Sequence, residues 1–136
     1  MADGAYGRWG IARTYALIFG IAYLAVAATE VITRDALEPV LEFTGIQNAI
    51  HWAVGAVVLL SFFGSESTAR LVARVIGVVF LAITIFGFVA PATLGELLGF
   101  DGDIPAAYNV VHALTAAVAL YAGFATRSTR GQAATA

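Results

Sequence analysis

The 136-residue chain has no cysteine, no lysine and few charged residues of either sign. Without cysteine it cannot form disulfides, thiolate metal sites or a cysteine nucleophile. Charged residues make up only 12% and hydrophobic residues 60% of the chain, whereas soluble proteins have roughly a quarter and half. A soluble domain of this length leaves too much of its surface exposed to hide so many apolar side chains. The composition predicts a single membrane domain over residues 1–136, with the lipid bilayer as its main partner.

Sequence signatures of catalysis are also missing. The chain has no glycine-rich phosphate loop, no Ser-His-Asp arrangement in a signature context and no glycosidase-like pair of carboxylates. Two histidines and one intramembrane glutamate are little material for catalysis, so we expect a protein that is not an enzyme. The arginines are explained by membrane topology, and we expect no nucleic-acid partner.

Four apolar segments are each long enough to cross ~30 Å of hydrocarbon, which takes ~20 helical residues. They cover about residues 11–32, 46–63, 71–90 and 105–124. The loops at 35–43 and 93–100 carry leucines at helical spacing with acids between them, which predicts short interfacial helices. We therefore expect an all-α, four-helix transmembrane bundle, followed by a flexible C-terminal tail at 126–136.

Arginine positions predict the orientation of the chain. Six of the seven arginines fall on one side of the predicted spans, and only Arg34 falls on the other. Positive residues favour the cytoplasmic side, so both termini are expected to be cytoplasmic. The six are Arg8, Arg13, Arg70, Arg74, Arg127 and Arg130.

The two halves of the chain resemble each other, with repeat one at about 11–64 and repeat two at about 69–125. Arg13 matches Arg70, and the run from Gly20 matches the run from Gly77, at an offset of 57. After an insertion of four residues, Asn48-Ala-Ile-His51 matches Asn109-Val-Val-His112. Each repeat holds two spans, which predicts a parallel repeat of helical hairpins rather than the inverted repeat typical of secondary transporters.

The paired motifs resemble those of a known family. Asn48-x-x-His51-x-x-x-Gly55 and Asn109-x-x-His112 each open an apolar helix, and Gly-x-x-Tyr/Phe-Leu signatures begin at Gly20 and Gly77. The chain is similar in these respects, over about residues 13–124, to the small four-helix prokaryotic membrane proteins called domain of unknown function 4383. The resemblance implies the topology and the membrane location, and it implies no activity.

The Asn-x-x-His motifs are the main candidate site. Residues three apart share one helical face, and both histidines lie roughly two turns inside the outer ends of their spans. Burying imidazole in lipid is costly unless it is hydrogen-bonded or coordinated. One hypothesis is packing, with Asn48 and Asn109 bonded across helices. A second is that His51 and His112 are axial ligands of a haem or related tetrapyrrole, with the asparagines behind them.

A third hypothesis is a proton-titrating or ion-binding pair of histidines assisted by Glu30. Glu30 comes 17 residues after Arg13, which places it roughly 25 Å further along the helix and near the outer boundary. Its counterpart in the second repeat is Gly87. We interpret Glu30 first as a snorkelling acid or a partner of Arg34, four residues on, and second as a functional intramembrane carboxylate. No metal site is predicted.

Three functions follow from these observations. The leading one is a structural or accessory membrane subunit, or a homo-oligomer, because so short a chain has little room for a substrate pathway of its own. The alternatives are a haem- or tetrapyrrole-binding protein that uses His51 and His112, and a small channel or proton-linked carrier with Glu30 at its mouth.

Overall fold

The computed structural model describes residues 9–37, 42 and 44–125, with the side chains of all of these except 34–37. The described residues form helices and no strands, which confirms the predicted all-α fold. The helices are α1 (Ile11–Leu37), α2 (Gly45–Phe62), α3 (Glu66–Val89), α4 (Pro91–Leu98) and α5 (Ala106–Phe124). Four of them, all but α4, are long and apolar enough to cross a membrane. The chain is a small membrane protein.

The boundaries differ from the prediction mainly at α3 and at the outer loops. α3 begins at Glu66 rather than 71, because the Ser65 side chain accepts a hydrogen bond from Thr68 N and caps the helix. α4 lies close to the interfacial helix predicted at 93–100. α1 continues to Leu37, while residues 38–41 and 43 of the other predicted interfacial helix, and the tail 126–136, lie outside the described residues.

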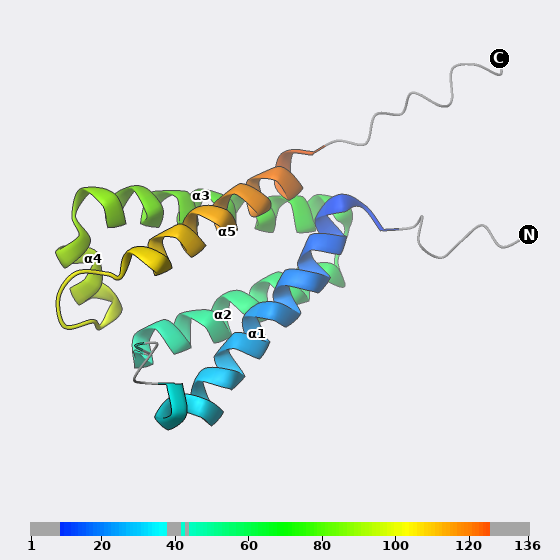
Figure 1. The fold of residues 1–136 in the computed structure, drawn as a ribbon. Coiled ribbons are helices and arrows are strands. Elements are labelled where there is room, and N and C mark those ends of the chain that lie inside the picture. The colour runs from blue at the N-terminus through cyan, green and yellow to red at the C-terminus, as the bar shows by residue number, and fades with distance from the viewer. Residues whose placement is uncertain (1–8, 38–41, 43, 126–136) are drawn as a thin grey trace, which may run out of the picture.

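The long helices pair as two hairpins, α1 with α2 and α3 with α5. Figure 1 shows that the hairpins meet at the end of the molecule that carries both termini and diverge toward the end that carries α4. Small side chains let the helices approach closely where the hairpins meet. The buried core there is largely alanine: Ala12, Ala16, Ala69, Ala73, Ala116, Ala119 and Ala122.

Glycines lie at close helix contacts in both hairpins, and Gly20 and Gly77 show this at matching positions. A Cβ atom added to Gly20 would lie 2.7 Å from the backbone N and Cα of Leu59. A Cβ atom added to Gly77 would lie 2.7 Å from the side chain of Leu120 and 2.9 Å from its backbone N. The two contacts fall at positions that the proposed repeat aligns, since Gly20 and Gly77 are 57 apart and Leu59 and Leu120 are 61 apart. The duplication itself stays a prediction.

Charged side chains close the end of the bundle that carries the termini. The Glu66 carboxylate accepts hydrogen bonds from the backbone N of Ala12 (3.0 Å) and Arg13 (3.1 Å), two donors of the first turn of α1 that have no partner within the helix. Arg13 Nε donates to Phe62 O (2.9 Å), and Arg74 Nε donates to Gly123 O (2.8 Å). The structural counterpart of Arg13 is therefore Arg74, one turn after the sequence match at Arg70.

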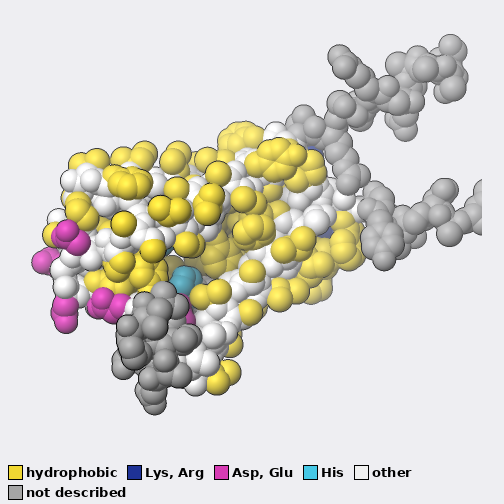
Figure 2. Space-filling model, viewed as in Figure 1, with side chains coloured by type: hydrophobic (Ala, Val, Ile, Leu, Met, Phe, Trp, Pro, Cys, Tyr) yellow, Lys and Arg dark blue, Asp and Glu magenta, His cyan; other side chains and the backbone are white. Residues whose placement is uncertain are grey.

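At the opposite end, loop contacts tie the two hairpins together. Thr44 Oγ1 donates to Leu98 O, and Tyr108 Oη donates to Glu42 O (2.9 Å). A second apolar cluster of Leu94, Leu98, Phe100 and Ile104 packs beneath α4. Acidic side chains gather on this end in Figure 2. These contacts fix the start of α5 and so the position of His112.

Candidate functional site

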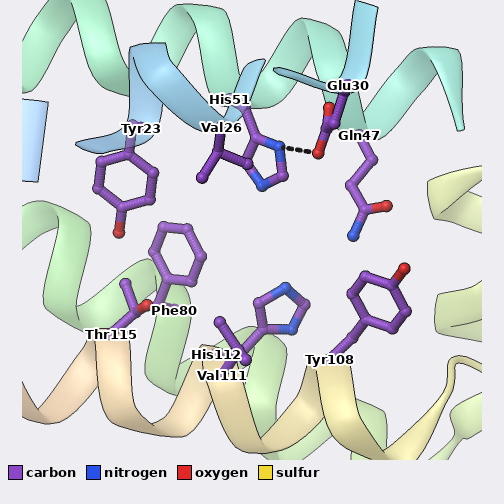
Figure 3. A pocket seen from close by; sticks show the side chains of 10 residues that line it. All are labelled: Tyr23, Val26, Glu30, Gln47, His51, Phe80, Tyr108, Val111, His112 and Thr115. Atoms are coloured by element: carbon purple, nitrogen blue, oxygen red, sulfur yellow. Dashed lines mark hydrogen bonds and ion pairs between the residues drawn. The ribbon is translucent and has the colours of Figure 1, made fainter. Parts of the chain in front are cut away.

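A cavity of about 240 Å³ lies between the two hairpins. All four long helices contribute to its walls, so neither hairpin forms it alone (Figure 3). Its lining residues are Tyr23, Val26, Glu30, Gln47, His51, Phe80, Tyr108, Val111, His112 and Thr115. The cavity therefore unites three residues that the sequence singled out: Glu30 from α1, His51 from α2 and His112 from α5.

Glu30 is the centre of a hydrogen-bond network in the first hairpin. Its side chain is only 4% exposed. Glu30 Oε1 accepts from His51 Nδ1 (2.8 Å), and Oε2 accepts from Asn48 Nδ2 (2.7 Å). Asn48 Nδ2 also donates to Ala27 O at 2.8 Å. The interpretation of Glu30 as a snorkelling acid is therefore wrong, because its carboxylate turns inward; the Arg34 side chain lies outside the described residues.

The second hairpin repeats this arrangement without the carboxylate. Asn109 Nδ2 donates to Thr84 O (3.3 Å), which corresponds to the bond from Asn48 to Ala27 O. Gly87 stands where the first hairpin has Glu30, and the Asn109 amide fills the space that a side chain at 87 would need. The Nδ1 atom of His112 is buried and has no hydrogen-bond partner. The two histidines therefore sit in different electrostatic surroundings.

Both imidazoles face the cavity from opposite walls. His51 and His112 each come six residues after the first residue of their helix, about 9 Å along the axis, so they lie at similar depth. Figure 3 shows the Glu30-bonded nitrogen of His51 turned to the wall and its second nitrogen pointing toward His112. A neutral imidazole that donates through Nδ1 carries a lone pair on Nε2. His51 can therefore accept a hydrogen bond from a molecule in the cavity.

Sequence reasoning found only part of this site. Asn48 lies behind the wall, where it holds Glu30, and Asn109 lies beside Gly87, outside the cavity lining. Gln47, Tyr108, Tyr23 and Thr115 were missed. Gln47 gave a usable signal, since a long amide in the first turn of an apolar span is costly to bury, and its side chain is 3% exposed with Oε1 unpaired.

The cavity opens sideways, toward the lipid. Val26 on α1 and Val111 on α5 line it, and they are 46% and 58% exposed. In a membrane this exposed face contacts acyl chains. Figure 2 shows imidazole atoms at the surface in the hollow between the hairpins. A molecule dissolved in the bilayer can therefore reach the histidines without crossing the acidic loops.

The donor set fits metal or haem ligation poorly. The described residues contain no group of three or more His, Cys, Asp or Glu side chains that could hold a metal ion. Metal-bound histidines almost always donate their other ring N–H to a partner; His51 meets this condition through Glu30, but His112 does not. The volume of about 240 Å³ is also below the ~300 Å³ at which pockets for drug-sized ligands begin.

Comparisons with known proteins place the chain in a family. Neither the curated proteins nor the solved structures contain a match to it. Residues 13–125 match the family model described as Domain of unknown function (DUF4383), which confirms the resemblance drawn from the paired motifs. Since the match covers most of the 136 residues, the chain belongs to this family.

Proposed function

We propose that the protein is a non-enzymatic membrane protein that takes up a small molecule from the lipid into the cavity between its hairpins. The observation that carries this proposal is the buried Glu30 carboxylate, which orients His51 at the cavity wall. Ionisable groups are expensive inside a membrane and mark functional sites there. Packing alone gives no reason to keep a carboxylate and an imidazole beside an open cavity, because apolar side chains of similar volume stabilise such sites equally well.

The same geometry argues against catalysis. A nucleophilic hydroxyl is activated when it lies within hydrogen-bond reach of an oriented base. In the described part of the chain, the His51 side chain is hydrogen-bonded to Glu30 and not to a hydroxyl group. The nearby Tyr108 hydroxyl is turned to the Glu42 carbonyl. We therefore propose binding without covalent chemistry.

Native mass spectrometry tests the binding proposal. Protein extracted with its own lipids in polymer-bounded discs is expected to carry one small molecule that stays through gentle activation. Thr115→Trp, which fills the cavity from its wall, should remove that mass, while Ala22→Trp on the lipid-facing side of α1 should retain it. Wild-type protein with no added mass, or an equal mass on the filled variant, would contradict the proposal.

We propose further that both termini face the cytoplasm of a prokaryotic cell and that the acidic loops face outward. Arg13 and Arg74 lie at one end of the bundle, while Glu96 in α4 and Asp101 and Asp103 in the loop after it lie at the other, which supports this orientation. Since the chain has no cysteine, single-cysteine variants report topology cleanly.

Asp101→Cys should react with an impermeant maleimide in intact cells, whereas Ser67→Cys should react only after permeabilisation. Both residues are exposed: Ser67 lies in the first turn of α3, and Asp101 lies in the loop after α4, at the other end of the bundle. Labelling of Ser67→Cys in intact cells, with Asp101→Cys protected, would reverse the orientation.

We also propose that the protein works as an accessory subunit or as a homo-oligomer, and that its hairpins arose by duplication. Large apolar side chains on every long helix are exposed, including Ile32, Leu60, Val89 and Tyr121. Assembly would cover part of this surface, with lipid covering the remainder. Cross-linking in native membranes that gives only monomers would contradict the assembly proposal. The contact between Glu30 and His51 is also one that the carrier hypothesis requires, whereas His112 lacks, among the described residues, the hydrogen-bond partner that haem-bound histidines have.

A further inference from the structure

We propose that the cavity selects a neutral, lipid-soluble phenol or hydroquinone, whose hydroxyl group donates a hydrogen bond to Nε2 of His51. This inference rests on the proposed function and names the class of molecule that the same cavity takes up. It follows from the hydrogen-bonding roles that the protein assigns to its own groups, from the shape of the walls and from the charge balance.

Glu30 makes His51 an acceptor. A carboxylate can only accept, so the proton between Glu30 Oε1 and His51 Nδ1 belongs to the imidazole. Nε2 then carries the lone pair and is available to accept a hydrogen bond. A basic nitrogen in an apolar cavity binds best to an O–H donor, because such a bond is shorter and stronger than one between neutral amides.

His112 offers the opposite role from the facing wall. Its Nδ1 is buried without a partner, and buried N–H groups without a partner are rarer in proteins than under-satisfied acceptors. The proton is therefore better placed on Nε2, which makes His112 a donor. A hydroxyl group both donates and accepts, so one phenol can donate a hydrogen bond to His51 and accept one from His112.

The size and shape of the cavity suit a single substituted ring. An apolar protein cavity of about 150 Å³ takes up benzene, and this one holds about 240 Å³. Phe80 and Tyr108 line it, and the Phe80 ring lies 5.6 Å from the His112 ring, a spacing typical of aromatic contacts. An alkyl tail on the ring can leave past Val26 and Val111 into the lipid.

The charge balance favours a neutral ligand. Both Glu30 oxygens already accept hydrogen bonds, from His51 and Asn48, so a cation would find the carboxylate engaged. An anion would lie near this buried negative charge at low dielectric, which is unfavourable. A neutral ring with hydroxyl groups avoids both costs.

The test compares two probes that differ in one property. A decyl-substituted dimethoxy-methyl-hydroquinone, kept reduced under anaerobic conditions, has two O–H donors; its bis-methyl ether has the same ring and tail but no donor. Binding is measured in lipid nanodiscs by competition against the tritium-labelled hydroquinone, with Thr115→Trp discs giving the lipid background. Wild-type protein is expected to bind the hydroquinone at least about tenfold more tightly than the ether, which corresponds to one hydrogen bond of about 1.4 kcal/mol.

Glu30→Gln should reverse the role of His51. Asn48 turns its Nδ2 donor toward residue 30 and holds it there with a bond to Ala27 O, so the new amide would turn its oxygen to Asn48 and its NH₂ to His51 Nδ1, which places the imidazole proton on Nε2. The preference for the hydroquinone should then fall to about one, while Glu96→Gln, which removes an exposed acid away from the cavity, leaves it unchanged. Equal binding of both probes to the wild type would overturn this inference and leave the binding proposal standing. If neither probe shows saturable binding, this inference is also overturned. The native mass spectrometry measurement then tests the broader binding proposal separately.

Discussion

His51→Ala lowers the free energy of unfolding by about 1.5–3 kcal/mol, the range for loss of a hydrogen bond to a charged group. The substitution leaves the Glu30 carboxylate, 4% exposed, with Asn48 as its remaining hydrogen-bond donor. A neutral interhelical hydrogen bond in a membrane contributes only about 0.6–1.7 kcal/mol, so the cost of the stranded charge dominates. The effect is measured by reversible unfolding in mixed lipid and detergent micelles.

The double variant Glu30→Gln/His51→Ala separates the charge from the packing. Removing the carboxylate charge takes away the main cost, so we expect the double variant to be more stable than His51→Ala alone. A double variant that is less stable than either single one would mean that the two side chains stabilise the hairpin independently, and would contradict the network. Glu30→Ala alone should cost less than His51→Ala, since the imidazole can move its proton to the nitrogen that faces the cavity.

Gly20→Leu separates α1 from α2 and is expected to cost about 3 kcal/mol or more, at or above the upper end of the usual range for overpacked cores. Even the first added carbon would lie 2.7 Å from the Leu59 backbone, and a backbone cannot rotate away as a flexible side chain can. The helix-propensity gain over glycine, about 1 kcal/mol, offsets only part of this cost. Thermal unfolding of the purified variant measures the loss.

Two controls make this result specific. Ala22→Leu adds three carbon atoms to the lipid-exposed side of the same helix and should leave stability within about 0.5 kcal/mol. Gly45→Ala adds a methyl group where nothing lies within 4 Å and should be equally neutral. If Gly20→Leu unfolds at the same temperature as these controls, the close approach of α1 and α2 is not as described.

The membrane spans could be predicted because they depend on composition and length, which the chain displays directly. The partners of Glu30 were predicted only in part: one hypothesis joined Glu30 to the histidines, but the preferred interpretation paired it with Arg34 at helical spacing along the same helix. The true partners, Asn48 and His51, lie on α2 and meet Glu30 only through the packing register of the hairpin. That register depends on the contact between Gly20 and Leu59, which spacing within one helix does not reveal.

The repeat could have predicted more about Glu30 than we inferred from it. Its offsets align Asn48 with Asn109, and Glu30 with Gly87, so an extra carboxylate in one hairpin was visible beside an otherwise equal motif. Other cavity residues, in contrast, gave no signal in the sequence. Phe80, Tyr108 and Thr115 look like ordinary apolar-helix residues, and only the divergence of the two hairpins turns them toward a shared space.

The central claim is that Glu30 fixes the proton of one histidine in a cavity that also holds the other. The chain has only two histidines, so nitrogen NMR of histidine-labelled protein in lipid gives two imidazole signals. We predict a signal protonated on Nδ1 that switches to Nε2 protonation in Glu30→Gln, and a second signal, from His112, protonated on Nε2 in both proteins. Two histidines with the same tautomer, neither of which responds to Glu30→Gln, would contradict the account.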